Sequence, residues 1–125
     1  MHRELFDLLA GTFAAFSNPT RVLHHAERGD RGADVLALAP LAAREAAAAS
    51  AHRAAAAHYA LALEHAHSAT AAARAELLEA AAHEQRLIGR VDVAMATTRE
   101  ALALRRELGD AAAVATNLRL IAEAR

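Results

Sequence analysis

The chain has 125 residues, about one ordinary domain, and its 14 basic and 15 acidic residues leave a formal net charge of −1. Alanine and leucine supply most of the apolar positions, whereas tryptophan is absent and tyrosine occurs once. Alanine and leucine favour helices, and the β-branched and aromatic residues typical of strands are scarce, so the composition excludes a sheet protein and predicts an all-α fold. The balanced charge argues against the net basic face of a nucleic-acid-binding domain.

The sequence contains no cysteine, which excludes disulfides, thiolate metal sites and a cysteine nucleophile. This is compatible with a reducing compartment, and we expect a cytoplasmic protein. Charged residues interrupt the first stretch, Met1–Asp7, which therefore does not fit a signal peptide. No window approaches the roughly 18 uninterrupted apolar residues of a membrane span. We expect no direct nucleic-acid partner and no membrane partner.

Glycine, proline and capping residues divide the chain into about seven helices. The expected helices cover residues 3–16, 19–28, 32–49, 50–67, 70–88, 90–108 and 110–125. Pro40 lies inside the third, where a proline costs about 3 kcal/mol and either kinks or divides a helix; the sequence leaves that choice open. Such short connections predict antiparallel neighbours.

The predicted helix ends carry their own signals. Gly89 is expected as the left-handed residue that ends the fifth helix, Gly109 as the residue that closes the sixth, and Asp110 as the cap of the seventh. The three serines at predicted boundaries are interpreted as caps rather than nucleophiles; they are Ser17, Ser50, which should open the fourth helix, and Ser68, in the Ser68–Thr70 cap of the fifth.

The sequence can be compared with itself after a displacement that places Ser50 on Gly89. This comparison aligns the third and fourth predicted helices with the fifth and sixth. The same displacement pairs Ala43 with Ala82, Ala55 with Ala94, Ala62 with Ala101 and Leu63 with Leu102. This order of small residues around a turn resembles the tetratricopeptide (TPR) helix-turn-helix pattern, although the TPR period is shorter, at about 34 residues, and an aromatic residue usually stands where this chain has Thr98. We expect a TPR-like α-solenoid of about seven antiparallel helices, with Ala94 and Ala101 buried where two helices meet.

The repeat also defines an expected domain organisation. An N-terminal helical segment should cover residues 1–31, followed by repeats at 32–69 and 70–109 and a half repeat at 110–125. A solenoid repeat cannot bury its apolar face alone. The seventh helix, which has no second helix of its own repeat after it in this sequence, should therefore expose the apolar residues Val114, Leu118, Leu120 and Ile121 and use them to form a homodimer.

Several segments resemble one family more specifically. They are Ala51–Leu63 (AHRAAAAHYALAL), Ala75–Glu79, Arg99–Asp110 and Leu23–Glu27, which are similar to helices of large ATP-binding transcriptional regulators of the LuxR type. The resemblance covers about residues 20–121 and implies a helical array that senses effectors or holds a regulator inactive. The chain has no Gly-x4-Gly-Lys-Ser/Thr loop, no lysine and no basic recognition helix, so neither ATP hydrolysis nor DNA binding is implied.

Eight histidines raise the question of a metal site. Glu64-x-x-His67 has the spacing of one half-site of a helical di-iron protein, but such proteins need two of these pairs and the chain has no second one. His24 and His25 fall on a helix that the resemblance makes a packing helix. We therefore expect no metal ion and no cofactor.

One predicted helix carries Glu76, Glu79 and His83 on one face, a set that could perform acid–base chemistry in a pocket. Such a trio is more often a hydrated stripe with a helix-stabilising Glu79–His83 pair, so we expect no catalytic residues and no enzyme. Arg105 and Arg106 close the next helix, where positive charge is favourable beside the helix dipole.

The function expected from these observations is a non-catalytic interaction or sensor module that binds a protein, a peptide or a small effector. His58, Tyr59 and His65 are the candidate groove residues, because the two histidines are seven residues apart on one predicted helix and the tyrosine is adjacent. Two alternatives stay open: a truncated remnant of a regulator without activity of its own, and a small helical metal-binding protein that uses its histidines.

Overall fold

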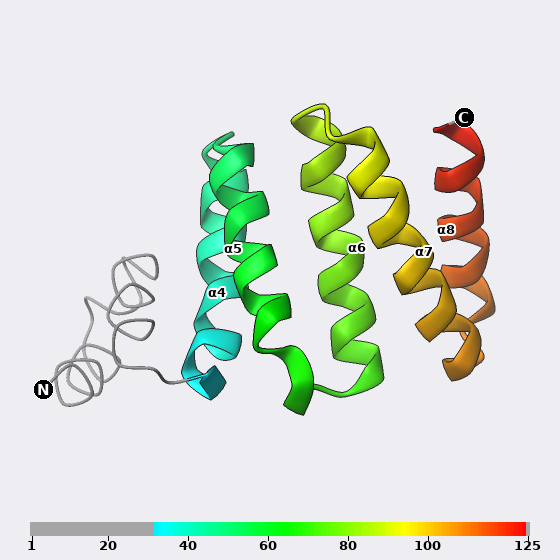
Figure 1. The fold of residues 1–125 in the computed structure, drawn as a ribbon, viewed down its shortest axis with the longest axis horizontal. Helices are drawn as coiled ribbons and strands as arrows, with labels where there is room; N and C mark the ends of the chain where they lie inside the picture. Colours follow the sequence, from blue (N-terminus) through cyan, green and yellow to red (C-terminus); the bar gives the residue numbers. More distant parts are fainter. Residues whose placement is uncertain (1–31, 125) are drawn as a thin grey trace, which may run out of the picture. The chain divides into compact units, whose positions relative to one another are not determined.

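The computed structural model describes residues 32–124, and within this range every regular element is helical. The elements are α4 (Gly32–Ala48), α5 (His52–Glu64), the short 3-10 helix η1 (Ala66–Ser68), α6 (Ala71–Leu87), α7 (Val91–Leu108) and α8 (Ala111–Glu123) (Figure 1). Helix accounts for 87% of the described residues and no strand occurs among them, which confirms the all-α prediction for this range. The helices expected at 3–16 and 19–28, the proposed segment 1–31 and residues Ser17, His24 and His25 lie outside it.

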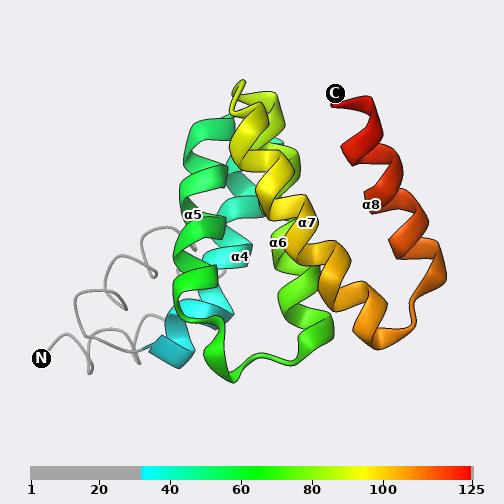
Figure 2. The same ribbon diagram turned by 45° about the vertical axis from the view of Figure 1, so that its right-hand side comes forward.

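The chain divides into two compact units, one ending at Ser68 and one beginning at Ala69. In the first unit α4 packs against α5, and in the second α6 packs against α7, which in turn packs against α8. α7 lies between α6 and α8 (Figure 2). Each unit therefore contains a helical hairpin, and the second unit has one further helix.

Three turns between consecutive helices have the same geometry. One residue in each turn is left-handed, with φ of 61° at Ser50, 84° at Gly89 and 71° at Gly109. That residue donates to a carbonyl three residues back and the next residue donates to one five residues back, as in Ala51 N to Ala46 O (2.8 Å) and Arg90 N to Gln85 O (2.9 Å). This is the Schellman arrangement, which satisfies the last carbonyls of a helix. The left-handed residues of the two hairpins, Ser50 and Gly89, are the pair that the repeat in the sequence superimposes.

The roles predicted for Gly89, Gly109 and Asp110 are confirmed. The Asp110 side chain accepts a hydrogen bond from Ala113 N at 3.1 Å and caps α8. Thr70, the last residue of the predicted Ser68–Thr70 cap, caps α6 in the same way through Ala73 N at 3.1 Å. Both caps bind a backbone N–H group of the first turn that has no partner within the helix.

Three details of the prediction are corrected, and the open question whether Pro40 divides its helix is answered. Ser50 does not open a helix: it is the left-handed residue after α4, and α5 begins at His52 with Ala51 at the N-cap. α5 ends at Glu64 rather than at residue 67. Ser68 lies in η1 and does not cap α6. Pro40 lies inside α4 without dividing it, although its nitrogen has no hydrogen to donate to the preceding turn.

Among residues 32–124, the interior of each unit consists mainly of alanine. The buried apolar residues are Val35, Ala39, Ala42, Ala43, Ala55, Tyr59, Ala62, Ala66, Ala75, Leu78, Ala81, Ala82, Ala94, Ala101, Leu102 and Ile121. The predicted burial of Ala94 and Ala101 is confirmed, with exposed fractions of 1% and 0%. Since alanine has no atoms beyond Cβ, these faces allow two helix axes to approach closely.

Candidate functional site

Five large apolar residues in the described part of the second unit are exposed, Leu87, Val91, Val93, Leu108 and Leu118, and the last of them lies on α8. Among the four residues predicted for self-association, Leu118 is 44% exposed, Val114 and Leu120 are half-buried, and Ile121 is 7% exposed. Ile121 is thus a core residue of the second unit. The exposed apolar face of α8 therefore differs from the predicted one: it includes Leu118 and excludes Ile121.

Leu118 lies on an exposed apolar stripe that also contains Ala111, Ala115 and Ala122. The spacings along this stripe are four, three and four residues, which place all four side chains on one side of an α-helix. We call these four residues the α8 stripe. It contains no charged residue; Arg119 and Glu123, which form an exposed ion pair at 3.9 Å, stand beside it.

α6 carries the same four residues at the same spacing, Ala71, Ala75, Leu78 and Ala82, at equal distances from its N-cap. In α6 this stripe is covered: Ala75, Leu78 and Ala82 are buried, and Ala71 is half-buried. Beside it, two α6 side chains bond to α7, Glu79 to Arg105 and Arg86 to Thr98. α7 is therefore the helix that covers this face of α6, whereas the same face of α8 is exposed.

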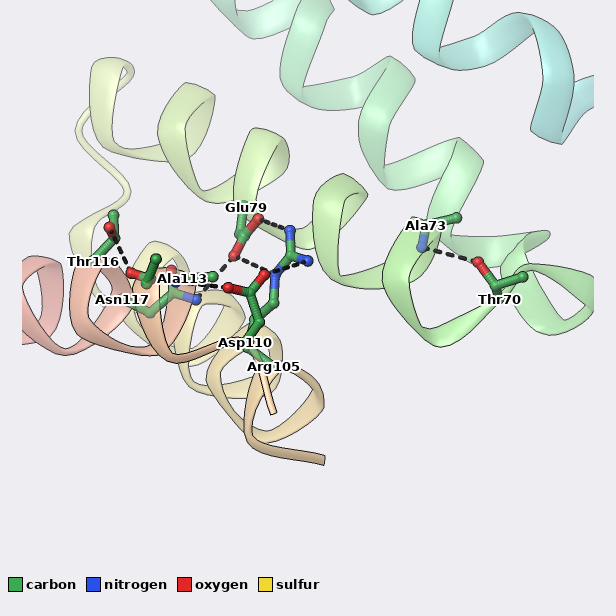
Figure 3. Close-up of polar contacts among 9 residues, drawn as sticks. Thr70, Ala73, Glu79, Arg105, Asp110, Ala113, Thr116 and Asn117 are labelled. Atoms are coloured by element: carbon green, nitrogen blue, oxygen red, sulfur yellow. Dashed lines mark hydrogen bonds and ion pairs between the residues drawn. The ribbon is translucent and has the colours of Figure 1, made fainter. Parts of the chain in front are cut away.

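A cluster of polar side chains connects α8 to the other two helices of the second unit (Figure 3). The Arg105 guanidinium of α7 donates two hydrogen bonds to the Glu79 carboxylate of α6, from Nη2 to Oε1 at 2.7 Å and from Nε to Oε2 at 3.0 Å. Asn117 of α8 is buried and donates from Nδ2 to Glu79 Oε2 at 2.9 Å. Arg105 Nη1 also donates to Asp110 Oδ2 at 3.4 Å. We call these four residues the Glu79 cluster.

The cluster joins all three helices of the second unit and affects the ionisation of Glu79. Hydrogen bonding from Arg105 holds the pKa of Glu79 below its ordinary value of 4.5; partial burial opposes this effect, and the bond from Asn117 adds to it. The same bond raises the pKa of Arg105. Glu79 is therefore an anion with a fixed structural partner, a role unlike that of a general acid or base.

Glu76, Glu79 and His83 do not form one site together. Glu76 and His83 are exposed, whereas Glu79 is half-buried and bonds to Arg105 and Asn117 instead of the predicted His83. Arg105 likewise acts through a contact with another helix, in addition to its position near the end of α7, while Arg106 is exposed.

The candidate groove residues are placed in different surroundings. Tyr59 is 6% exposed and belongs to the core of the first unit. His58 is half-buried on α5. His65 is also half-buried and lies one residue beyond the end of α5, near the start of α4: a methyl group added to Gly32 would lie 3.1 Å from His65 Nδ1. Because Tyr59 is enclosed, it offers little surface to a ligand.

In the described range, the structure does not support a metal site at Glu64 and His67, the pair with di-iron half-site spacing. Glu64 is the last residue of α5 and His67 lies in η1, so the two do not share a continuous helical turn. Between residues 32 and 124, no three histidine, aspartate or glutamate side chains are grouped in a way that could hold a metal ion.

The sequence reasoning missed Asn117, Asp110 as a partner of Arg105, and the α8 stripe. A signal for the stripe was present: aligning the caps Thr70 and Asp110 superimposes Leu78 on Leu118 and Ala82 on Ala122. Nothing local in the sequence indicates that a glutamate 38 residues before Asn117 would accept its hydrogen bond.

No family model, no curated protein and no solved structure matches this chain. In the part of the chain that the structure describes, none of the helices has both the length and the apolar character required to cross a membrane.

Proposed function

We propose that this chain is a non-catalytic, TPR-like helical-repeat module that acts by binding another helix on the α8 stripe. In this proposal the chain is related to the repeat region of the ATP-binding LuxR-type transcriptional regulators and works in the cytoplasm. The relation rests on the sequence resemblance alone, and the location rests on the absence of cysteine.

The observation that carries the proposal is the contrast between two equivalent stripes. Leu78 of the α6 stripe is 5% exposed, whereas Leu118 of the α8 stripe is 44% exposed. Because the residues and their spacing are identical, the α8 stripe has the side chains with which this fold already packs one helix against another. Helices that dock into apolar surfaces use anchors with this periodicity.

The type of ligand follows from the chemistry of the stripe. Three alanines leave room for a close helix backbone, and one leucine provides an apolar anchor. A helix that offers small residues one turn or two turns apart, as α7 does with Ala94 and Ala101, fits this surface best. A charged or nucleotide-like ligand would find no complementary group on the stripe.

Site-specific photo-crosslinking in the source cells tests this function. A photoreactive amino acid at Ala115, on the stripe, should form adducts with a bound helix, whereas the same amino acid at exposed Ala103 of α7 should not. The adduct is identified by mass spectrometry, and the identified protein is then purified. It should bind the wild-type chain and lose binding to Leu118→Glu.

The negative outcomes are also informative. Adducts at Ala103 as frequent as those at Ala115 would show random collisions. If neither position gives an adduct under any growth condition, the chain is better described as a regulator remnant without an activity of its own.

A further inference from the structure

We propose that the helix that occupies the α8 stripe is α8 of a second copy of this chain, in an antiparallel, two-fold symmetric pair. This inference rests on the proposed function, because it names the partner for the same surface. The evidence consists of the order of the residues along the stripe, their exposure, and the way that the chain covers the equivalent stripe of α6.

The spacing of the residues along the stripe is the same in both directions. Ala111, Ala115, Leu118 and Ala122 are separated by four, three and four residues, so an antiparallel copy presents the same spacing. A two-fold axis between Ala115 and Leu118 places Ala115 of each copy opposite Leu118 of the other, and Ala111 opposite Ala122. Each leucine thus meets a small residue. In a two-fold interface the same patch must complement itself, and this order of residues meets that condition.

The direction of the helices follows a precedent within the chain. The α6 stripe is covered by α7, which joins α6 through a tight Schellman turn and runs antiparallel to it (Figure 1). If α8 of a second copy packs antiparallel on the α8 stripe, it covers this stripe as α7 covers the α6 stripe. Its contact residues are again small, since three of the four are alanine.

The charges next to the stripe are compatible with this pair. Arg119 and Glu123 are exposed and bond to each other at 3.9 Å within one copy. The two-fold relation places Arg119 near Ala112 and Thr116 of the second copy, so the two arginines do not face each other. No charged side chain has to be buried when the pair forms.

The size of the surface predicts a weak dimer. A stable interface of standard size buries about 800 Å² on each partner, and one pair of helices of 13 residues offers less. The dimer should therefore form at micromolar or higher concentration and dissociate on dilution. It would be detected as a change of mass with concentration.

The first experiment is sedimentation equilibrium of the full chain over micromolar to millimolar concentration. The wild type should shift from monomer to dimer, and Leu118→Glu should stay monomeric. Leu41→Glu is the matched control, because Leu41 of α4 has the same exposed fraction of 44% but lies in the other unit. It should dimerise like the wild type. A wild-type chain that stays monomeric throughout, or two variants that lose the dimer equally, would overturn the proposal.

The second experiment tests the direction and register with introduced cysteines, which are the only thiols in a chain that has none of its own. The double variant Ala111→Cys/Ala122→Cys should form a covalent dimer on mild oxidation, because these two positions face each other across the pair. Within one helix the two positions are about 16 Å apart, whereas a disulfide requires Cα atoms within about 7 Å, so no bond forms inside one chain.

Each single-cysteine variant is the control, since its two thiols lie at opposite ends of the antiparallel pair. Single variants should crosslink far less than the double variant. Equal crosslinking by a single variant would indicate a parallel pair or random collisions and would overturn the proposed geometry, as would a double variant that does not crosslink. If the chain is monomeric but Ala115 is photo-crosslinked to a different protein, the proposed function stands and only self-pairing is wrong.

Discussion

The carboxylate of Glu79 is the charged group that links the three helices of the second unit. It accepts hydrogen bonds from α7 and α8 and belongs itself to α6, so three helices depend on one side chain. Its exposed fraction of 27% means that water screens part of the interaction. The contribution to stability is therefore expected to be moderate and measurable.

Replacing Glu79 with alanine should lower the free energy of unfolding by about 1–2 kcal/mol, because hydrogen bonds to charged groups contribute roughly 1.5–3 kcal/mol and partial exposure reduces that contribution. Glu76→Ala, an exposed glutamate on the same helix, is the control and should change the free energy of unfolding by less than about 0.5 kcal/mol. Urea denaturation followed by circular dichroism measures both. Equal effects of the two substitutions would contradict the structural role of Glu79.

The lowered pKa of Glu79 predicts a pH dependence of stability. The pKa of this carboxyl is below 4.5 in the folded chain and close to 4.5 in the unfolded chain, so the unfolded state binds more protons between these two values. The stabilisation is fully present above about pH 4.5 and is lost as the pH falls through the folded pKa. Urea midpoints of the wild type and of Glu79→Gln should therefore differ at neutral pH and converge in acid. A constant difference would show that Glu79 does not titrate in this way.

At the scale of elements, the helix hairpins depend on left-handed residues in their turns. Gly89 suits a φ of 84°, because glycine has no Cβ atom that would clash in this region. Ser50 has a φ of 61° in the equivalent turn, where a non-glycine residue costs roughly 1–2 kcal/mol. The two turns thus have the same backbone shape, but the left-handed conformation costs more free energy at Ser50 than at Gly89.

Exchanging the residues of these two turns should have opposite effects. Ser50→Gly should stabilise the chain by about 0.5–1 kcal/mol, since part of the conformational gain is offset by the greater freedom of glycine when unfolded. Gly89→Ser should destabilise it by about 1 kcal/mol, entirely through the backbone, because an added Cβ would meet no atom within 4 Å. Thermal melting measures the signs. Changes of the same sign in both variants would contradict the common turn geometry.

Alanine in the hairpin core limits which residues the helices tolerate. Ala101→Leu should destabilise the chain by about 1–3 kcal/mol, because Ala101 is completely buried and the additional atoms must displace neighbouring groups. Ala103→Leu, two residues along the same helix but exposed, should change the free energy of unfolding by less than about 0.5 kcal/mol. A melting temperature unchanged by Ala101→Leu would refute the predicted TPR register.

At the scale of the whole molecule, pairing through the α8 stripe links stability to concentration. A partner that binds only the folded chain raises the melting temperature as its concentration increases. The wild type should therefore melt at a higher temperature in concentrated solution, and the melting temperature of Leu118→Glu should not depend on concentration. Differential scanning calorimetry over a hundredfold range of concentration measures both. Parallel behaviour of the two proteins would argue against the pair.

The sequence alone determined the features that depend on neighbouring residues. It predicted an all-helical chain, the left-handed Gly89, the closing residue Gly109, the cap at Asp110 and the burial of Ala94 and Ala101. These features follow from backbone conformation, from capping within one turn and from the spacing of small residues, all of which are local.

Only the tertiary structure decided which surfaces and charges are used. It placed Ile121 in the core and Leu118 outside, although the two residues are three positions apart on one helix, because α7 covers only part of the surface of α8. It also paired Glu79 with Arg105 and Asn117, which lie 26 and 38 residues away, in preference to His83 on the same helix. A hydrogen bond or a buried face depends on which segments meet in space. Segments that are far apart along the chain leave no local signal in the sequence of their later contact.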